Sequence, residues 1–219
     1  MGICELAERK LAAGMSSNLR EYARFRLNMR ILPDKGDYCL NDGEMNPEIL
    51  RAFAFKVKEV LSPFPLWEPF SGNMGSKSRT KFLMAQYGLG VLCCGLDHTD
   101  PDIEIVDSTT HSPRVGSIGG AIFHPPYFGS RWFTNRAEDL SHIENYDTYQ
   151  EKLASVVCRI RNATTSGMLV CAVGRRYRYL GEEVSLDLMY LRLFDSGFTL
   201  IDVWSSMPDI VLIFRRVLC

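Results

Sequence analysis

Short apolar segments alternate with helix-like segments over most of this chain, and this alternation restricts it to a small group of folds. The apolar segments are short and nearly continuous, as expected for strands of a parallel sheet that helices cover on both faces. They are Leu66–Trp67, Val91–Cys94, Ile103–Val106, Ala121–Phe123 and Met168–Val173, and the helix-like segments between and after them are 76–87, 146–161 and 186–195. The pattern predicts an α/β fold with a mainly parallel sheet.

The last two apolar segments, 198–203 and 210–214, break this pattern. They are separated only by the Ser205–Asp209 segment, which is too short to hold a crossover helix. Strands joined by so short a connection must be antiparallel. The expected sheet is therefore mainly parallel, with an antiparallel strand near the C-terminus.

The first sixty residues are different in character. Residues 3–32 have a helical pattern with a break at Gly14, and a linker rich in Asp, Gly and Asn follows. A second helix is expected over 46–61, with Pro47 in its first turn. We therefore expect residues 1–60 to form a helical cover or extension and residues 61–219 to form the main domain.

Composition restricts the function classes. With 219 residues and 46% hydrophobic content the chain can bury one substantial core. A formal net charge of −1 means that any nucleic-acid site must be a local basic patch. No apolar run approaches the roughly 20 residues that span a bilayer, and no signal peptide is evident, so we expect a soluble intracellular protein, cytoplasmic or nuclear.

Cysteine and histidine are not spaced as metal ligands. The chain has seven cysteines and four histidines, with no paired metal-binding spacing among them. We therefore expect reduced core thiols and no metal site.

The segment with the most chemical information is His124-Pro125-Pro126-Tyr127-Phe128, directly after an expected buried strand. Paired prolines fix the backbone and contribute carbonyl acceptors without N–H donors, and Tyr127 adds a flat ring. Acceptors beside a stacking ring suit a planar group that bears an amine, such as adenine or cytosine. The structural alternative is a plain rigid turn.

A second candidate segment runs from Glu68 to Gly75, where the first strand of the domain turns into a helix. Gly72 and Gly75 would let the backbone approach a bound cofactor, and the helix N-terminus would direct free N–H groups at it. Such glycine spacing alone is weak evidence, because many strand-to-helix connections use glycine.

Two acids follow the next two strands. Asp97 is placed to accept hydrogen bonds from ribose hydroxyls, and a turn aspartate is the alternative. Asp107 follows the Ile103–Val106 strand, and its structural alternative is a helix cap.

These segments together resemble the amino-directed DNA methyltransferases, whose catalytic motif is Asp-Pro-Pro-Tyr, Asn-Pro-Pro-Tyr or Ser-Pro-Pro-Tyr, and in particular a subgroup with His-Pro-Pro-Tyr. Glu68-Pro69-Phe70-Ser71-Gly72 resembles the cofactor loop of that family, with the second glycine displaced to Gly75. The resemblance covers residues from about 61 to 217 and implies a class I, Rossmann-like methyltransferase domain that binds S-adenosylmethionine. By this resemblance the cofactor contacts are Glu68, Phe70, Gly72, Gly75, Asp97 and Asp107, the last of them beside the adenine, and the catalytic residues are His124, Pro125, Pro126 and Tyr127.

The chemistry expected at His124 follows from the weak nucleophilicity of an exocyclic amine. Catalysis needs acceptors that draw on the N–H bonds of the amine and align its nitrogen with the methyl group. A neutral imidazole at His124 and the Pro125 carbonyl could supply them, while Tyr127 stacks on a base swung out of its helix. Phe128, behind Tyr127, is assigned to the nucleic-acid contacts together with the arginines of a later basic segment.

A basic segment, Arg175-Arg176-Tyr177-Arg178-Tyr179, follows the next strand and is expected at the rim beside Tyr127. Phosphate contacts by the three arginines are one interpretation, and ion pairs with Glu182, Glu183 or a partner protein are the other. The chain has no inserted segment long enough for a separate target-recognition domain, so a partner protein could supply recognition. The predicted function is methyl transfer to the exocyclic amine of adenine or cytosine in DNA. The alternatives are an RNA base methyltransferase and a catalytically silent methyltransferase-like subunit.

Overall fold

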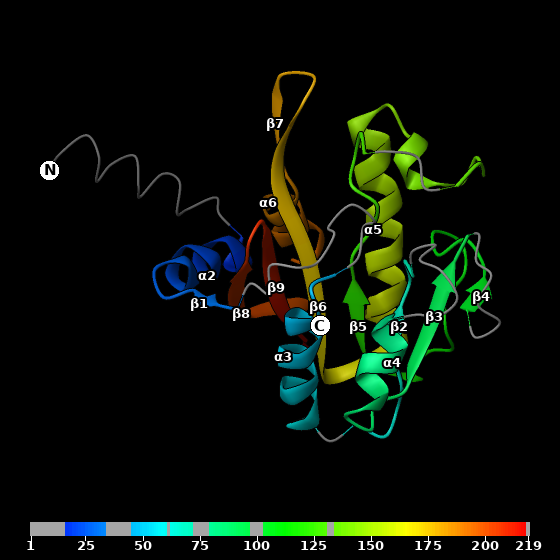
Figure 1. Ribbon diagram of the computed structural model, residues 1–219, viewed down its shortest axis with the longest axis vertical. Coiled ribbons are helices and arrows are strands. Elements are labelled where there is room, and N and C mark those ends of the chain that lie inside the picture. Colours follow the sequence, from blue (N-terminus) through cyan, green and yellow to red (C-terminus); the bar gives the residue numbers. More distant parts are fainter. Residues whose placement is uncertain are drawn as a thin grey trace, which may run out of the picture.

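The computed structural model describes residues 16–33, 45–60, 62–71, 79–96, 103–130 and 134–217 (Figure 1). Its helices are α2 (Ser17–Arg26), α3 (Pro47–Lys58), α4 (Arg79–Ala85), the 3-10 turn η2 (Leu140–His142), α5 (Tyr146–Ala163) and α6 (Leu186–Leu193). Its strands are β1 (Arg30–Ile31), β2 (Leu66–Glu68), β3 (Val91–Gly95), β4 (Ile103–Ile105), β5 (Ile118–Phe123), β6 (Thr164–Tyr179), β7 (Glu182–Ser185), β8 (Phe198–Ser206) and β9 (Asp209–Arg216).

One sheet organises the molecule, with strand order β1-β8-β9-β6-β5-β2-β3-β4 and β7 paired to the end of β6. Within the main sheet all neighbours are parallel except β9, which runs antiparallel to both β6 and β8. The mainly parallel sheet with an antiparallel strand near the C-terminus is therefore confirmed. Because β9 runs against the others, its first residue, Asp209, lies at the same edge of the sheet as the carboxyl ends of the parallel strands.

Helices cover both faces of the sheet. Helices α2, α5 and α6 pack in one apolar cluster with residues such as Trp67 and Val170, and α3 and α4 pack in a second cluster with Leu66 and Leu169. Neighbouring strand residues belong to opposite clusters because side chains alternate across a strand. The same alternation separates the adjacent thiols of Cys93 and Cys94, both buried and free.

The described part of the first sixty residues packs on this sheet. Strand β1 pairs with β8, and the Asn18 side chain of α2 donates to the Phe198 carbonyl (3.2 Å) and accepts from the Leu200 N–H (2.8 Å). The helix expected to continue to Leu32 ends at Arg26, so that part of the prediction was wrong. It ends there because the next residues leave the helix to extend the sheet through the Arg30–Ile31 strand.

Strand β6 is longer than the sequence indicated, and β7 was not predicted. The two form a hairpin that projects beyond the main sheet (Figure 1). Its turn residues Leu180 and Gly181 have φ of 49° and 88°, and two positive values are the mark of a tight hairpin turn. The basic segment expected on a rim loop is therefore on the extended strand of a hairpin.

The helices in the described part of the chain are short or amphipathic. None of them is long and apolar enough to cross a membrane.

Candidate active site

The site lies where the order of strands in the sheet reverses. Strand β2 pairs with β3 on one side and with β5 on the other, so the loops after β2 and β5 leave the same edge next to each other. Ligands of open α/β sheets bind at such a reversal, outside the carboxyl ends of the strands. The loop after β2 contacts the end of β5, because the rings of Phe70 and Phe123 are T-shaped with centroids 5.6 Å apart.

The His124–Phe128 loop is held in place by hydrogen bonds to its carbonyls. The Tyr149 hydroxyl donates to the Pro126 carbonyl (2.8 Å), and the Tyr177 hydroxyl donates to the Phe128 carbonyl (2.6 Å). Within the described ranges neither the His124 nor the Pro125 carbonyl accepts a hydrogen bond, so both remain open to a ligand.

A chain of polar contacts joins this loop to β9. His124 Nε2 lies 3.2 Å from the Tyr127 hydroxyl oxygen, and that hydroxyl donates to Asp209 Oδ1 at 3.3 Å. Asp209 is 3% exposed and also accepts from Arg175 Nε at 2.9 Å. Four polar side chains from β6, β9 and the loop after β5 are therefore linked at one edge of the sheet.

Burial sets the protonation states of the two aromatic members of this chain. Desolvation lowers the pKa of His124, against an upward effect of Asp209 and with a further lowering by Arg175. Burial, followed by the charge of Asp209, raises the pKa of Tyr127 well above its usual value. A neutral imidazole and a protonated phenol follow at neutral pH.

The aromatic rings around the loop form a packed wall. Tyr127 stacks on Tyr177 with centroids 6.0 Å apart and planes at 17°, and the Arg175 guanidinium lies 5.5 Å from the Tyr127 ring centroid. Phe128, assigned from the sequence to nucleic-acid contact, is 5% exposed and packs against Tyr146 and Tyr179. The structure thus places Phe128 in the core behind the loop.

Gly129 brings the hairpin against this loop. A Cβ at this position would lie 2.2 Å from the Tyr179 ring, and its φ of +65° also favours glycine. The β6–β7 hairpin therefore packs directly on the end of the His124–Phe128 segment.

The loop after β2 is held by a buried carboxylate. Glu68 accepts from the hydroxyls of Ser71 (2.7 Å) and Thr80 (2.6 Å), which tie the loop to the start of α4. A Cβ at Gly95, the last residue of β3, would lie 2.8 Å from the Ser71 carbonyl oxygen. Glu68 is therefore engaged within the protein, and Gly95, which sequence reasoning missed, allows the loop to cross the end of β3.

Asp107 lies in a turn after β4. Its carboxylate accepts from the Thr109 N–H (2.8 Å) and the Thr109 hydroxyl (2.7 Å), and the segment that follows is a turn and not the helix of the alternative interpretation. Val106, one residue earlier, donates its N–H to the Gly95 carbonyl (2.9 Å), so the ends of β3 and β4 meet. Gly72, Gly75 and Asp97 lie outside the described residues.

The three arginines of the basic segment differ from one another. Arg175 pairs with Asp209, and Arg176 pairs with Asp187 at 2.8 Å, so neither uses the glutamates of the hairpin that the sequence suggested. Arg178 is exposed and makes no ion pair within the described ranges. Of the three, Arg178 is the side chain whose charge is free for a phosphate.

Asp209 and Asp187 are the site residues that sequence reasoning missed. Asp209 had one usable signal, because the first residue of an antiparallel strand lies at the carboxyl edge of the parallel strands. Asp187, in the first turn of α6, has the usual pattern of an acid at a helix N-terminus and gives no sign of a partner.

Comparisons with known proteins agree on the architecture. No protein-family model matches the sequence, and no curated protein matches it significantly. Among solved structures, an rRNA methylase from Streptococcus thermophilus has a TM-score of 0.50 at 14% identity over 80% of this chain and 99% of its own. TrmN from Thermus thermophilus has a TM-score of 0.51 at 13% identity over 82% of this chain and 51% of its own. The chain has the class I, Rossmann-like methyltransferase fold.

A third structure of this kind, from work on the conversion of a disulfide bond into a thioacetal group during echinomycin biosynthesis, has a TM-score of 0.50 at 13% identity over 75% of this chain and 81% of its own. Identities this low establish the fold alone. In this chain the sheet runs in the order β8-β9-β6-β5-β2-β3-β4, and β1 extends the edge beside β8.

Proposed function

We propose that this protein is an S-adenosylmethionine-dependent methyltransferase that acts on the exocyclic amine of adenine or cytosine in nucleic acid, with DNA as the first substrate. One observation carries the proposal. On a methyltransferase fold, the His124–Tyr127 segment leaves β5 beside the loop after β2, at the reversal of strand order, and it presents an unused carbonyl and a neutral imidazole there.

The described residues fit the cofactor. The crossing of the Ser71 carbonyl over Gly95 makes a close backbone approach that a side chain at residue 95 would block. Beside it lie the partly buried Val106 and Asp107, an apolar side chain and a carboxylate that suit an adenine ring and its amine. When bound, S-adenosylmethionine supplies an electrophilic methyl group; Phe70, Val106 and Asp107 would hold it, together with Gly72, Gly75 and Asp97.

The protein's own part in the reaction is to hold the amine. His124 and the Pro125 carbonyl accept hydrogen bonds from the two N–H groups of the amine. These bonds draw electron density toward the amine nitrogen and fix the direction of its lone pair. The face of the Tyr127 ring opposite Tyr177 would provide the stacking surface for the base. The hydrogen bonds from Tyr149 and Tyr177 to the neighbouring carbonyls keep the loop in this conformation before substrate arrives.

RNA is the alternative substrate, and the fold admits it, since the rRNA methylase of Streptococcus thermophilus shares this fold. RNA of this kind can be recognised by its shape. A methyltransferase-like subunit that binds a partner and performs no catalysis is the other alternative. Measurements of cofactor binding, nucleic-acid binding and methyl transfer separate these three.

The first expected result concerns cofactor binding. Calorimetry should show one binding site for S-adenosylmethionine. Gly95→Ala should reduce the affinity for S-adenosylmethionine about tenfold or more, because a methyl group at residue 95 displaces the loop after β2. The matched control is Gly90→Ala, just before the other end of β3, where a Cβ meets only Pro65 at an ordinary 3.5 Å. Its affinity should equal that of the wild type.

Two results would contradict the cofactor assignment. One is the absence of binding or thermal stabilisation by the wild-type protein at millimolar S-adenosylmethionine. The other is equal affinity in Gly95→Ala and wild type. Binding without methyl transfer to any DNA or RNA would support the silent subunit.

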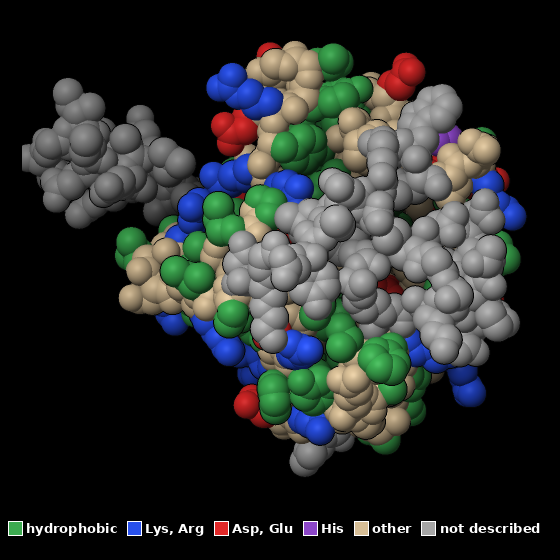
Figure 2. Space-filling view, viewed as in Figure 1, with side chains coloured by type: hydrophobic (Ala, Val, Ile, Leu, Met, Phe, Trp, Pro, Cys, Tyr) green, Lys and Arg blue, Asp and Glu red, His purple; other side chains and the backbone are tan. Residues whose placement is uncertain are grey.

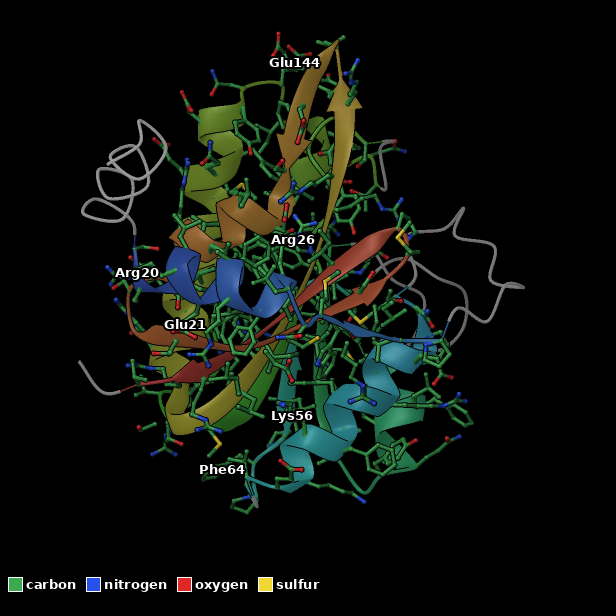
Figure 3. All side chains as sticks on the ribbon, turned by 90° about the vertical axis from the view of Figure 1, so that its left-hand side faces the viewer. Arg20, Glu21, Arg26, Lys56, Phe64 and Glu144 are labelled. Atoms are coloured by element: carbon green, nitrogen blue, oxygen red, sulfur yellow. The ribbon has the colours of Figure 1, made fainter. Side chains whose placement is uncertain are left out.

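The surface for nucleic acid is expected along the β6–β7 hairpin. Lys and Arg side chains gather between α2 and the lower part of this hairpin (Figure 2). Helix α2 is oriented with Arg26 toward the base of the hairpin and Arg20 away from it (Figure 3). A nucleic-acid strand lying along this face would place its phosphates near Arg178.

We therefore expect Arg178→Ala to weaken nucleic-acid binding and to reduce the slope of log affinity against log salt by roughly 0.7 to 0.9, the value of one lost phosphate contact. Arg114→Ala is the control, since Arg114 is also exposed but precedes β5, at the opposite edge of the sheet from His124. It removes the same charge and should leave the slope unchanged.

Salt-titrated binding to single-stranded and double-stranded DNA and RNA makes the measurement and also ranks the substrates. Equal slopes for Arg178→Ala and wild type would remove the hairpin from the interface. Absence of binding to all four nucleic acids would favour a partner protein that supplies target recognition.

A further inference from the structure

Two side chains of one loop meet a third, from far along the chain, at the candidate active site. His124 and Tyr127 come from the loop after β5, and Asp209 is the first residue of β9. In the sheet, Asp209 lies directly opposite Arg175 of β6. The resemblance that identified the His-Pro-Pro-Tyr motif assigned no role to β9.

The hydrogens in this chain of contacts can be assigned by counting donors. A carboxylate only accepts, so the 3.3 Å contact between Tyr127 and Asp209 Oδ1 must contain the single hydroxyl hydrogen of Tyr127. The Tyr127 oxygen then has only lone pairs left for His124 Nε2, 3.2 Å away. Nε2 must therefore carry the hydrogen, and in a neutral ring Nδ1 is left bare.

We infer that Asp209 is a positioning residue that fixes, through the Tyr127 hydroxyl, the tautomer of His124 in which Nε2 is protonated and Nδ1 is the acceptor for the target amine. The inference rests on the proposed function for the role of the amine, whereas the tautomer itself can be measured without any substrate. Within the described ranges Nδ1 makes no hydrogen bond, so it is not engaged by the protein.

The tautomer matters because an amine presents N–H donors. The opposite tautomer would direct an N–H at another donor and lose the acceptor. Asp209 suits the positioning role because it is buried and held by Arg175, so its oxygen has a fixed place and cannot rotate toward solvent. Loss of a carboxylate that orients a catalytic histidine can reduce kcat by up to roughly 10⁴-fold.

Nitrogen NMR of protein labelled in its histidine rings tests the inference, because protonated and bare ring nitrogens have well-separated shifts. The signals of His124 are assigned by their loss in His124→Gln. The wild type should show Nε2 protonated and Nδ1 bare. A wild-type ring with Nδ1 protonated would overturn the inference without any variant.

The variants test whether Asp209 is the cause. Asp209→Asn keeps an oxygen for Tyr127 and Arg175 and should keep the tautomer. The paired change Asp209→Leu with Arg175→Leu removes the acceptor without leaving an unpaired buried guanidinium. Tyr127 is then free to donate to Nε2, and the population with Nδ1 protonated should rise. An unchanged tautomer in this pair would refute the role of Asp209.

A matched control is Tyr177→Phe, which removes a hydroxyl that holds the same loop through the Phe128 carbonyl but lies outside the chain to Asp209. It should leave the His124 tautomer unchanged.

If methyl transfer is observed, the double variant Asp209→Leu with Arg175→Leu should lower kcat about 100-fold. Asp209→Asn should retain most of the wild-type kcat. The proposed function fails alone if the tautomer is as inferred but no nucleic acid is methylated. The inference fails alone if methylation proceeds with Nδ1 protonated.

Discussion

Replacement of His124 by alanine should lower kcat for methyl transfer roughly 10²- to 10³-fold, the effect of removing one fixed hydrogen-bonding group that acts on the reacting atoms. His124→Asn keeps an acceptor at this position and should retain measurable turnover. The affinity for S-adenosylmethionine should hardly change in either variant, since the cofactor contacts are expected from the loops after β2, β3 and β4. Equal turnover in all three proteins would show that backbone carbonyls suffice and that the imidazole has no catalytic role.

The pH dependence of the wild type tests the same role. The groups around His124 are Tyr127 on its own loop, Asp209 on β9 and Arg175 on β6, and burial outweighs the upward effect of Asp209 to lower the pKa of His124. The active form is the neutral one, so activity should be constant near pH 7 and decline as pH falls through that pKa, below about 6.5. The decline should be absent from His124→Asn. A profile that rises toward acid would contradict the neutral acceptor.

The core of the fold could be predicted because its signals are local. Apolar runs such as Val91–Cys94 identify buried strands, and the short Ser205–Asp209 connection excludes a crossover helix. The candidate catalytic loop was found for the same reason, since strand, prolines and tyrosine are contiguous.

The features that the sequence did not predict depend on register and on partners far along the chain. The pairing of Arg175 with Asp209 requires the alignment of β6 with β9, and the β8–β9 pairing contains an irregularity between Leu200 and Asp202 that no local pattern reveals. The β6–β7 hairpin was missed because its turn is Leu180–Gly181, without the Asn or Asp that usually marks such turns.

Arg176 is a second residue whose distant partner the sequence did not reveal. Its sequence neighbours suggested a phosphate ligand, whereas the structure gives it a structural role. Its guanidinium donates to both oxygens of Asp187, which is 0% exposed, and to the Tyr22 hydroxyl at 3.3 Å. Tyr22 in turn donates to Asp187, and burial followed by this hydrogen bond raises the pKa of Tyr22 to about 12. Arg176 thus joins β6, α6 and α2 around one buried carboxylate.

We expect Arg176→Ala to reduce the free energy of unfolding by roughly 2–4 kcal/mol. The variant leaves the Asp187 carboxylate buried without its guanidinium partner, and of the two side chains that donate to it only the Tyr22 hydroxyl remains. The loss is smaller than for a fully buried ion pair because the Arg176 side chain is 34% exposed. Urea denaturation followed by circular dichroism makes the measurement. Arg178→Ala, two residues further along the same strand and exposed, is the matched control and should stay within about 0.5 kcal/mol of wild type.

Two further results separate an ion pair from a phosphate contact at Arg176. Replacing both partners, as Arg176→Met with Asp187→Leu, should be less destabilising than Arg176→Ala alone, because no charge is then left buried without its partner. The slope of log affinity against log salt for nucleic-acid binding should be the same in Arg176→Ala and wild type, measured well below the unfolding transition, and reduced only in Arg178→Ala. A stable Arg176→Ala protein with a reduced slope would instead restore Arg176 to the nucleic-acid surface and leave Asp187 satisfied by other means.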